Sequence, residues 1–594
     1  MTAEEYEEDE DQDEEPSIST RTRSKKVNFE LDNKTTDLRN DVVGAYYISL
    51  PHKEELTEIS IYRVEIPAKH HGRPDVLAAK KKEIENLCFY DTWTEVPYTG
   101  QELVGTKWVI TESEKQDGQK QAVKGRLCCK GYEETLKPQS DSPTISRSNI
   151  LVFSAIAANQ NFHLWAIDIK GAYLQSNILD RDIFIRPPTD IQKEIGTDIV
   201  WKLNKPMYGL DDSGRKFYLK VKEILLGMDF DEMHEDNAFF YLNKDGNLIA
   251  MISSHVDDFK IAATEETGEE IIKKIEEHLT ISKVDKDKFR FTGVDFTRTE
   301  DSIIISMEDY AESLTKIDHF RTDSKESPLT KTEHKLFRKK VGQLSWLANN
   351  VRPDLSFPVQ SLSQKNATPT LGDLKKINHV VKLAKAQENK ISFSYIDDRE
   401  HLQIFGVSDA SWSVKERPVS GTIYMLGSTR NDRVSPLTWK SRTILNPTKS
   451  VKDAETRALS IIAGDSPHFA RMVERLLFGT TKKRMPVKCF SDNRPLLETI
   501  ASTKSPINKD LNDTIRYLKD KLSWEEVQSY SWLPTKRMIS DFLTKEMKIG
   551  GDVWDIFRHN TWKDGKTKMN LVTVKGIEFM LSNPTIKEDE ESAG

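Results

Sequence analysis

The chain has 594 residues, of which 37% are hydrophobic and 31% are charged, and its formal net charge is -8. This length suggests about four domains, and no apolar run approaches the roughly 18 residues that a membrane span needs. Acidic residues rather than an apolar leader follow Met1, so no signal peptide is expected. The four cysteines include no C-x-x-C pair, which argues against a zinc site or a disulfide framework and favours a reducing compartment.

The negative charge is concentrated at the two ends of the chain. Residues 1–15 contain ten acids and no base, and residues 587–591 contain four acids and one lysine. The rest of the chain is mildly basic, which suits a nucleic-acid partner, although a solvated surface of mixed charges is the commoner explanation. The polar residues 1–40 predict a disordered tail. Within them, the basic run 20–26 is either a nuclear-localisation or nucleic-acid patch or, more commonly, a solvated segment.

The first folded elements precede a strand that ends in a carboxylate. A charged helix is predicted over residues 76–87. A β-hairpin follows, with strands at 107–110 and 122–129 and basic side chains along the second strand. A buried helix at 150–157 then leads into an alternating strand that carries Asp168 near its end.

Two further acids lie side by side between apolar runs. Asp257 and Asp258 separate residues 248–252 from residues 259–263, which predicts a hairpin with two negative charges at its tip. Those charges repel each other unless a divalent cation, shared with a third carboxylate such as Asp168, relieves the repulsion. Two Mg²⁺ ions roughly 4 Å apart are the arrangement that polymerases use for phosphoryl transfer. The sequence therefore predicts two Mg²⁺ ions per active site, with Mn²⁺ as an alternative ion.

The remaining elements suggest a helical segment and then a new domain. Helices are predicted at 217–226 and 269–279, and a second hairpin around Phe291-Thr292-Gly293 and residues 303–305. Residues 308–390 have a mostly helical pattern. Short strands at 402–407, 419–426, 437–439 and 487–490 then indicate a separate domain. No clear pattern continues beyond about residue 550.

The new domain carries four acids on separate elements. Asp409 and Asp492 follow strands, Glu455 lies on a helix, and Asp541 opens a helix. Each acid taken alone fits a turn or a helix cap. Acids that converge from separate elements on two cations are, however, what a two-metal nuclease needs. The order of the four favours the nuclease interpretation.

These motifs together resemble the reverse transcriptase–RNase H part of a copia-type LTR retrotransposon polyprotein, from about residue 91 to about residue 545. The resemblance is carried by Lys107-Trp108-Val109, Lys124-Gly125-Arg126-Leu127, Asp168-Ile169-Lys170-Gly171-Ala172-Tyr173-Leu174, Lys205-Pro206-Met207-Tyr208-Gly209-Leu210, Val256-Asp257-Asp258, Val341-Gly342-Gln343-Leu344, Arg352-Pro353-Asp354-Leu355, Ser408-Asp409-Ala410, Trp439-Lys440-Ser441, Ala454-Glu455, Asp492-Asn493 and Asp541-Phe542-Leu543-Thr544-Lys545.

The resemblance implies an α+β fold, in which a right-hand polymerase of fingers, palm and thumb is followed by an RNase H-like α/β domain. Its expected parts are a tail at 1–40, fingers and palm at 60–305, a helical thumb or connection at 306–398, an RNase H-like domain at 399–547 and a C-terminal tail at 548–594.

The resemblance also assigns roles to individual residues. It implies that the polymerase metals are held by Asp168, Asp257 and Asp258, and the RNase H metals by Asp409, Glu455, Asp492 and Asp541. Lys124 and Arg126 are implied to hold the incoming triphosphate, which suits the forked contacts of arginine with phosphate. Tyr173 is implied to exclude a ribose 2′-OH. Phe291, Thr292 and Gly293 are implied to grip the primer end.

The implied function is RNA-directed DNA synthesis, with cleavage of the RNA strand of RNA–DNA hybrids. The expected partners are an RNA template, a DNA primer, an RNA–DNA hybrid and dNTPs, with no membrane and an unknown oligomeric state. The expected location is a cytoplasmic virus-like particle, with nuclear entry through residues 20–26. Two alternatives remain: a degenerate or domesticated fragment that only binds nucleic acid, and a nuclease whose polymerase half is a scaffold.

Two residues depart from the usual pattern of such polyproteins. His255 stands where a tyrosine or phenylalanine often precedes Val-Asp-Asp, and Asp212 stands where many relatives carry a glutamine near the nucleotide. These changes put the primer contact and the positioning of the nucleotide in doubt, respectively. The sequence also shows no aspartic protease motif, zinc knuckle or integrase set, so we expect a fragment or a processed product.

Overall fold

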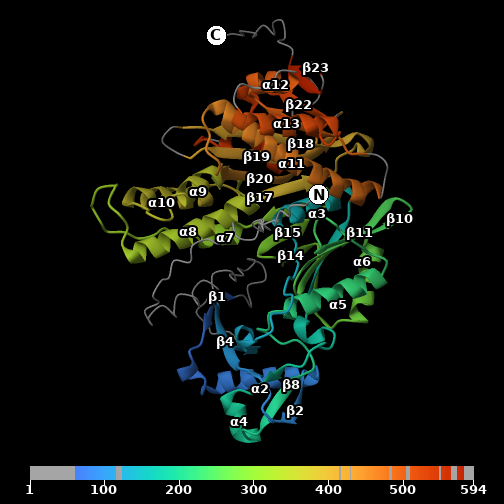
Figure 1. Cartoon of the computed structure of the whole chain (residues 1–594), viewed down its shortest axis with the longest axis vertical. Coiled ribbons are helices and arrows are strands. Elements are labelled where there is room, and N and C mark those ends of the chain that lie inside the picture. The colour runs from blue at the N-terminus through green and yellow to red at the C-terminus, as the bar shows by residue number, and fades with distance from the viewer. Residues whose placement is uncertain are drawn as a thin grey trace, which may run out of the picture. The chain divides into compact units, whose positions relative to one another are not determined.

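The computed structural model describes residues 60–115, 123–413, 417–428, 430–479, 484–502, 509–547, 550–562, 571–574 and 576–580 (Figure 1). The predicted tail at 1–40, its basic run, the turn at 117–118 and the acidic end at 587–591 lie outside these residues. Within the described part of the chain, no helix is both long enough and apolar enough to cross a membrane.

Two small sheets form the first part of the described chain. An antiparallel sheet has the order β1-β4-β5, which confirms the predicted hairpin, and helix α2 packs on β5. A four-stranded sheet has the order β2-β8-β7-β3. These elements are β1 (Ser60–Glu65), α2 (Pro74–Phe89), β2 (Trp93–Pro97), β3 (Leu103–Val104), β4 (Thr106–Lys115), β5 (Lys124–Cys129), β7 (Phe184–Ile185), α4 (Thr189–Ile195) and β8 (Ile199–Leu203).

A six-stranded sheet of order β13-β6-β12-β11-β10-β9 forms the centre of the first half. Its elements and helices are α3 (Arg147–Asn159), β6 (His163–Ile169), η5 (Ala172–Gln175), α5 (Ser213–Gly227), β9 (Asp231–Glu232), β10 (Phe239–Lys244), β11 (Asn247–His255), β12 (Asp258–Ala263), α6 (Glu265–Glu276) and β13 (Ile281–Lys286).

The two faces of this sheet have different surroundings because side chains alternate along each strand. Trp165, Ile167 and Ile169 of β6 share one buried cluster with the apolar faces of α5 and α6. Helix α6 approaches the sheet closely, since a Cβ on Gly268 would lie 2.2 Å from the Trp165 ring. Asp168 has the opposite parity on β6, so the sheet places it on the face away from this cluster.

A four-stranded antiparallel sheet and a group of helices follow. The sheet has the order β14-β15-β16-β17, and its last strand returns after the helices, so it crosses the expected boundary at residue 306. Helix α8 contacts both α9 and α10 (Figure 1). The elements are β14 (Lys288–Phe291), β15 (Val294–Arg298), β16 (Ser302–Ser306), α7 (Glu308–Ser313), α8 (Lys331–Asn350), η6 (Pro353–Leu355), α9 (Ser356–Ser363), α10 (Leu371–Ala386) and β17 (Lys390–Ser394).

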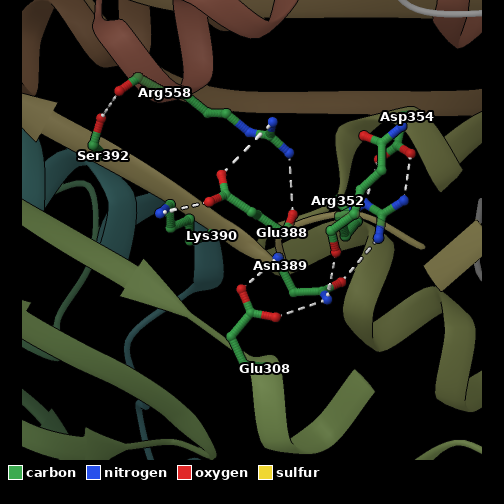
Figure 2. A network of polar contacts seen from close by, with 9 residues as sticks. Glu308, Arg352, Asp354, Glu388, Asn389, Lys390, Ser392 and Arg558 are labelled. Atoms are coloured by element: carbon green, nitrogen blue, oxygen red, sulfur yellow. Dashed lines mark hydrogen bonds and ion pairs between the residues drawn. The ribbon is translucent and has the colours of Figure 1, made fainter. Parts of the chain in front are cut away.

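A buried arginine connects these helices to the start of β17 (Figure 2). The Arg352 side chain is 1% exposed and donates two hydrogen bonds to the Asp354 carboxylate, at 2.8 and 2.7 Å. It also donates to two carbonyl oxygens in the last turns of α10 and, at 2.9 Å, to Asn389 Oδ1. The backbone and side-chain amides of Asn389 in turn donate to Glu308, at the start of α7.

The same network reaches the last part of the chain (Figure 2). Arg558 donates to the Glu388 carbonyl oxygen at 3.2 Å, and its guanidinium lies 3.8 Å from the Glu388 carboxylate. The Ser392 hydroxyl of β17 donates to the Arg558 carbonyl oxygen at 2.6 Å. The polar contacts of Figure 2 therefore join the helical segment, β17 and residues near the C-terminus.

The last part of the chain contains a mixed sheet of order β20-β19-β18-β21-β22-β24-β23. Strands β20, β19 and β18 are antiparallel, whereas β21, β22 and β24 run parallel to β18, and the long helix α11 packs on β18. The elements are β18 (Leu402–Ser411), β19 (Val419–Ser428), β20 (Val434–Thr443), α11 (Val451–Phe478), β21 (Val487–Ser491), α12 (Arg494–Ala501), α13 (Lys509–Ser523), β22 (Ser529–Trp532), η9 (Asp541–Leu543), α14 (Gly551–Trp554), η10 (Asp555–His559), β23 (Leu571–Val574) and β24 (Ile577–Met580).

Two details differ from the sequence expectation. Strand β18 continues through Asp409 to Ser411, because Asp409 still pairs with Gly421 of β19. The expected C-terminal tail from residue 548 contains ordered elements instead. Trp562 is 2% exposed and β24 pairs with β22, so burial of apolar side chains holds this segment on the sheet.

Candidate functional site

Strand register brings the first set of aspartates together. Asp168 on β6 is the direct partner of Asp258 on β12, and Asp257 occupies the turn between β11 and β12. The Ile169 amide donates to the Asp257 carbonyl oxygen at 2.9 Å, which ties the turn to β6. Only Asp257 therefore lies in the predicted Asp-Asp turn, because Asp258 already pairs as the first residue of β12.

The turn that carries Asp257 is strained. Val256 has φ 61°, a left-handed conformation that is an outlier for a β-branched residue. Such a conformation costs about 1–2 kcal/mol and persists only where surrounding structure enforces it. The enforcing contacts are the His255–Asp258 pair that closes the hairpin and the adjacent strand β6.

The three carboxylates affect one another electrostatically. Burial raises the pKa of Asp257, and the nearby Asp168 charge raises it further. Burial, together with the charges of Asp257 and Asp168, raises the pKa of Asp258 to about 7. The Asp168 carboxylate also accepts a hydrogen bond from the Ser282 hydroxyl of β13. Asp257 and Asp258, whose pKa values are raised by burial and by neighbouring negative charge, are suited to bind a cation.

A basic and aromatic group lies beside these acids. The Arg126 guanidinium of β5 stands over the Tyr208 ring, 5.5 Å from its centroid, and its charge offsets part of the rise that burial causes in the pKa of Asp257. Tyr173 of η5 packs against Tyr208 with ring centroids 5.4 Å apart. Lys124 has the same parity as Arg126 on β5 and is exposed. The structure thus brings Arg126, Tyr173 and the turn carboxylates into one neighbourhood.

The loop that carries Tyr208 is docked on β5 by close backbone contacts. The Cys129 amide donates to the Tyr208 carbonyl oxygen at 2.7 Å. Gly209 has φ +92°, and a Cβ there would lie 2.1 Å from the Cys129 carbonyl oxygen. Only glycine fits this approach. The position of Tyr208 between Arg126 and Tyr173 therefore depends on Gly209.

The predicted primer hairpin lies next to the aspartates. Thr292 and Gly293 have φ 49° and 77°, so they form a tight two-residue turn between β14 and β15. Phe291, Arg290 and Lys283 line an open hollow together with Asp168 and Asp258. Of the three predicted hairpin residues, Phe291 thus lines the same hollow as the aspartates, and Thr292 and Gly293 form the turn that follows it.

The second set of acids converges from three elements. Among the described residues, Asp409, Glu455 and Asp492 form the group of acids whose oxygens lie within 4.8 Å of one another, an arrangement that can hold a metal ion. Burial and the Asp409 and Asp492 charges raise the pKa of Glu455, whose buried Oε2 has no hydrogen-bond partner. Glu455 Oε1 accepts from the Ala410 amide at 3.0 Å. A buried carboxylate oxygen without a partner fits a cation ligand.

Asp541 takes a different position in the same site. It opens the short helix η9, and its Oδ1 lies 3.1 Å from the Lys545 ammonium nitrogen. The neighbouring Thr544 hydroxyl donates to the Asp409 carboxylate. The structure therefore brings all four predicted acids to one site, where Lys545 lies against Asp541 and Asp409.

Part of the chain matches a known protein family. Residues 90–331 match the family described as reverse transcriptase (RNA-dependent DNA polymerase). The retrovirus-related Pol polyprotein from transposon RE1 of Arabidopsis thaliana is 26% identical over 439 residues, which cover 70% of this chain and 29% of that protein. The transposon TyH3 Gag-Pol polyprotein of Saccharomyces cerevisiae is 24% identical over 516 residues, which cover 80% and 28%.

The chain is thus similar to the reverse transcriptase region of copia-type retrotransposon polyproteins. It spans under a third of the length of these relatives. Among solved structures, the foamy viral protease-reverse transcriptase in complex with RNA/DNA hybrid covers 81% of this chain and 56% of its own, at 13% identity and a TM-score of 0.47.

The structure shows the surroundings of the two residues that depart from the usual pattern of such polyproteins. Asp212 is 1% exposed, and its Oδ1 accepts from Arg181 at 2.9 Å, so it forms a buried ion pair at the start of α5. His255 ends β11 opposite Asp258, and burial lowers its pKa. The partner of Asp212 was missed because Arg181 lies in an irregular segment with no sequence pattern.

Three residues that contact the two sites lie inside motifs quoted above but had no predicted role. Tyr208, Thr544 and Lys545 each stand in a motif that carried the resemblance, yet none was given a role. The contact of Tyr208 with Arg126 and the contacts of Thr544 and Lys545 with Asp409 arise between segments far apart in the chain. The signal that could have indicated a role for Tyr208 and Lys545 was the presence of an aromatic or basic residue inside a quoted motif.

Proposed function

We propose that the chain is an RNA-directed DNA polymerase that also cleaves the RNA strand of RNA–DNA hybrids. The observation that carries the proposal is the direct pairing of Asp168 with Asp258, beside Asp257, in a chain that matches the reverse transcriptase family. Arg126 and Tyr173 stand beside this pair, as a nucleotide-binding site requires.

The proposed architecture assigns the sheets to polymerase parts. The β1-β4-β5 sheet with α2 serves as fingers, the six-stranded sheet as palm, and helices α8, α9 and α10 as thumb or connection. The mixed sheet from β18 onward serves as an RNase H-like domain. Its support is the strand order, in which three antiparallel strands precede parallel β21 and β22 and the long helix α11 packs on β18.

Oxygen donors make the palm site suitable for Mg²⁺ or Mn²⁺, which Asp168, Asp257 and Asp258 would hold. Two bound ions would neutralise the charge on the transferred phosphate and lower the pKa of the primer 3′-OH. Arg126 and Lys124 bind the triphosphate, and the docked Tyr208 fixes the direction of the Arg126 guanidinium. Tyr173 limits the space at the sugar, so a 2′-OH is excluded.

The primer end is positioned by the β14–β15 hairpin. Phe291 is 1% exposed and anchors the hairpin in the core, while the Thr292-Gly293 turn brings its backbone toward the primer strand. The protein recognises mainly the backbone and shape of the template–primer duplex, so affinity falls as salt rises.

In the second site, Asp409, Glu455 and Asp492 would hold a divalent ion, which would supply charge neutralisation at the scissile phosphate. The hybrid is recognised through the 2′-OH and minor-groove shape of its RNA strand. By analogy with the Pol polyproteins that the chain resembles, we place these activities in a cytoplasmic virus-like particle, with nuclear entry through residues 20–26.

The test compares the parent chain with two single variants. Asp257→Asn should abolish primer extension on an RNA template but leave hybrid cleavage, and Asp492→Asn should do the reverse. Loss of neither activity would refute these residue assignments. Hybrid binding by a parent chain without either activity would instead support the binding-only alternative, and cleavage without extension would support the scaffold alternative.

A further inference from the structure

The four acids of the second site fall into two groups. Asp409, Glu455 and Asp492 lie close enough to share one ion, whereas Asp541 is not part of that cluster among the described residues. Asp541 is instead engaged by a cationic side chain, since the Lys545 ammonium nitrogen lies 3.1 Å from its Oδ1. Asp541 thus already has a cationic partner, whereas Glu455 of the three-acid cluster has a buried oxygen without a partner.

Lys545 also reaches a member of the three-acid cluster. Its ammonium nitrogen lies 3.6 Å from Asp409 Oδ2, so it bridges Asp409 and Asp541. The backbone sets this position, because the Lys545 amide donates to the Asp541 carbonyl oxygen at 3.0 Å. Thr544 anchors the same turn through its hydrogen bond to Asp409. The bridge thus follows from the local fold rather than from a loose surface contact.

The Lys545 ammonium group carries a positive charge at neutral pH, because the ordinary pKa of a lysine is about 10.4. A second divalent ion between the same two carboxylates would meet this positive charge at close range. The lysine and that ion exclude each other by like-charge repulsion.

We propose that the Lys545 ammonium group occupies the second-cation position of this site, between Asp409 and Asp541, and competes there with a second divalent ion. The inference rests on the proposed nuclease function of the site. It follows that the protein without hybrid binds one ion tightly, at the three-acid cluster. A second ion binds only when Lys545 moves away, which its flexible stem and 44% exposed side chain allow.

The test is a Mn²⁺ titration of the full chain, with free Mn²⁺ measured by electron paramagnetic resonance. All variants carry Asp257→Asn and Asp258→Asn, so that the polymerase site contributes no ions. The parent background should bind one ion tightly and a second weakly. Lys545→Gln should raise the affinity for the second ion by about tenfold or more. A positive charge at this range shifts the equilibrium by which a carboxylate binds a cation by at least that factor.

Three further variants serve as controls. Lys545→Arg keeps the positive charge and should behave like the parent background. Lys488→Gln removes a lysine that pairs with Glu578 at 3.2 Å, away from the four acids, and should also leave both ions unchanged. Glu455→Gln should lower the affinity for the tightly bound ion, which would assign that ion to the three-acid cluster.

The outcomes separate the two levels of the proposal. An equal affinity for the second ion in the parent background and in Lys545→Gln would overturn the role of Lys545 and leave the nuclease proposal standing. No effect of Glu455→Gln on any bound ion would overturn the metal site itself. A melting curve for each variant shows whether the fold is retained, and a Lys545→Arg protein that binds the second ion tightly would also refute the competition.

Discussion

Replacing Arg352 by methionine tests whether the network of Figure 2 stabilises the fold. Methionine has a similar length but cannot donate hydrogen bonds. The substitution removes two bonds to Asp354, two to carbonyl oxygens of α10 and one to Asn389. The Asp354 carboxylate, whose side chain is 14% exposed, then loses its cationic partner in a largely buried position.

The expected loss follows from this burial. Removing one partner of a buried ion pair costs about 3–5 kcal/mol, because the other charge remains without compensation. For a domain of about 150–250 residues, each kcal/mol shifts the melting temperature by roughly 2–4 °C. We therefore expect the transition of the domain that contains α8, α9 and α10 to move down by about 10 °C.

The assay is differential scanning calorimetry of the full chain, in which each domain transition is followed separately. Arg558→Met is the matched control, because Arg558 belongs to the same network but its ion-pair partner Glu388 is 54% exposed. An exposed pair contributes about 0–1 kcal/mol, so its transition should move only slightly. Equal shifts in the two variants would refute the reasoning that burial of Arg352 makes its contacts stabilising.

Three other variants test the polymerase half. Arg126→Lys keeps the charge but loses the forked phosphate contact and the stacking on Tyr208, so the KM for dNTPs in primer extension should rise about tenfold; an unchanged KM would contradict the triphosphate role. Tyr173→Ala should lower the preference for dNTPs over rNTPs in single-nucleotide incorporation, and an unaltered preference would exclude Tyr173 as the sugar gate. Gly209→Ala should cost more than about 2 kcal/mol of unfolding free energy, because its Cβ would lie 2.1 Å from the Cys129 carbonyl oxygen; a normal denaturation curve would show that this close contact is wrong.

The carboxylate positions were predictable because they depend on local patterns. Alternating apolar residues located the strand of Asp168, and two apolar runs located the hairpin of Asp257 and Asp258; the pairing of Asp168 with Asp258 follows once these strands join one sheet. The strain at Val256 was not predictable, since nothing in the residue type signals a positive φ. The sequence pattern therefore located Asp168, Asp257 and Asp258 but not the backbone conformation that presents them.

Long-range contacts explain what the sequence did not indicate. Strand β17 pairs with β16 although the helices from α7 to α10 separate them, and short apolar runs do not reveal their partners. The position of Lys545 required η9, β18 and α11 to be assembled first. The four acids thus indicated the second site in the sequence, whereas nothing in the sequence indicated that Lys545 lies between Asp409 and Asp541.

The pairing of β24 with β22 has a consequence for biosynthesis. Because β24 follows every other strand of the mixed sheet in the sequence, the sheet cannot be completed until residue 580 has left the ribosome. The edge of β22 is unpaired until then and can pair with other chains. Premature termination shortly after residue 547 would therefore yield a protein with every proposed catalytic acid but with an aggregation-prone sheet edge.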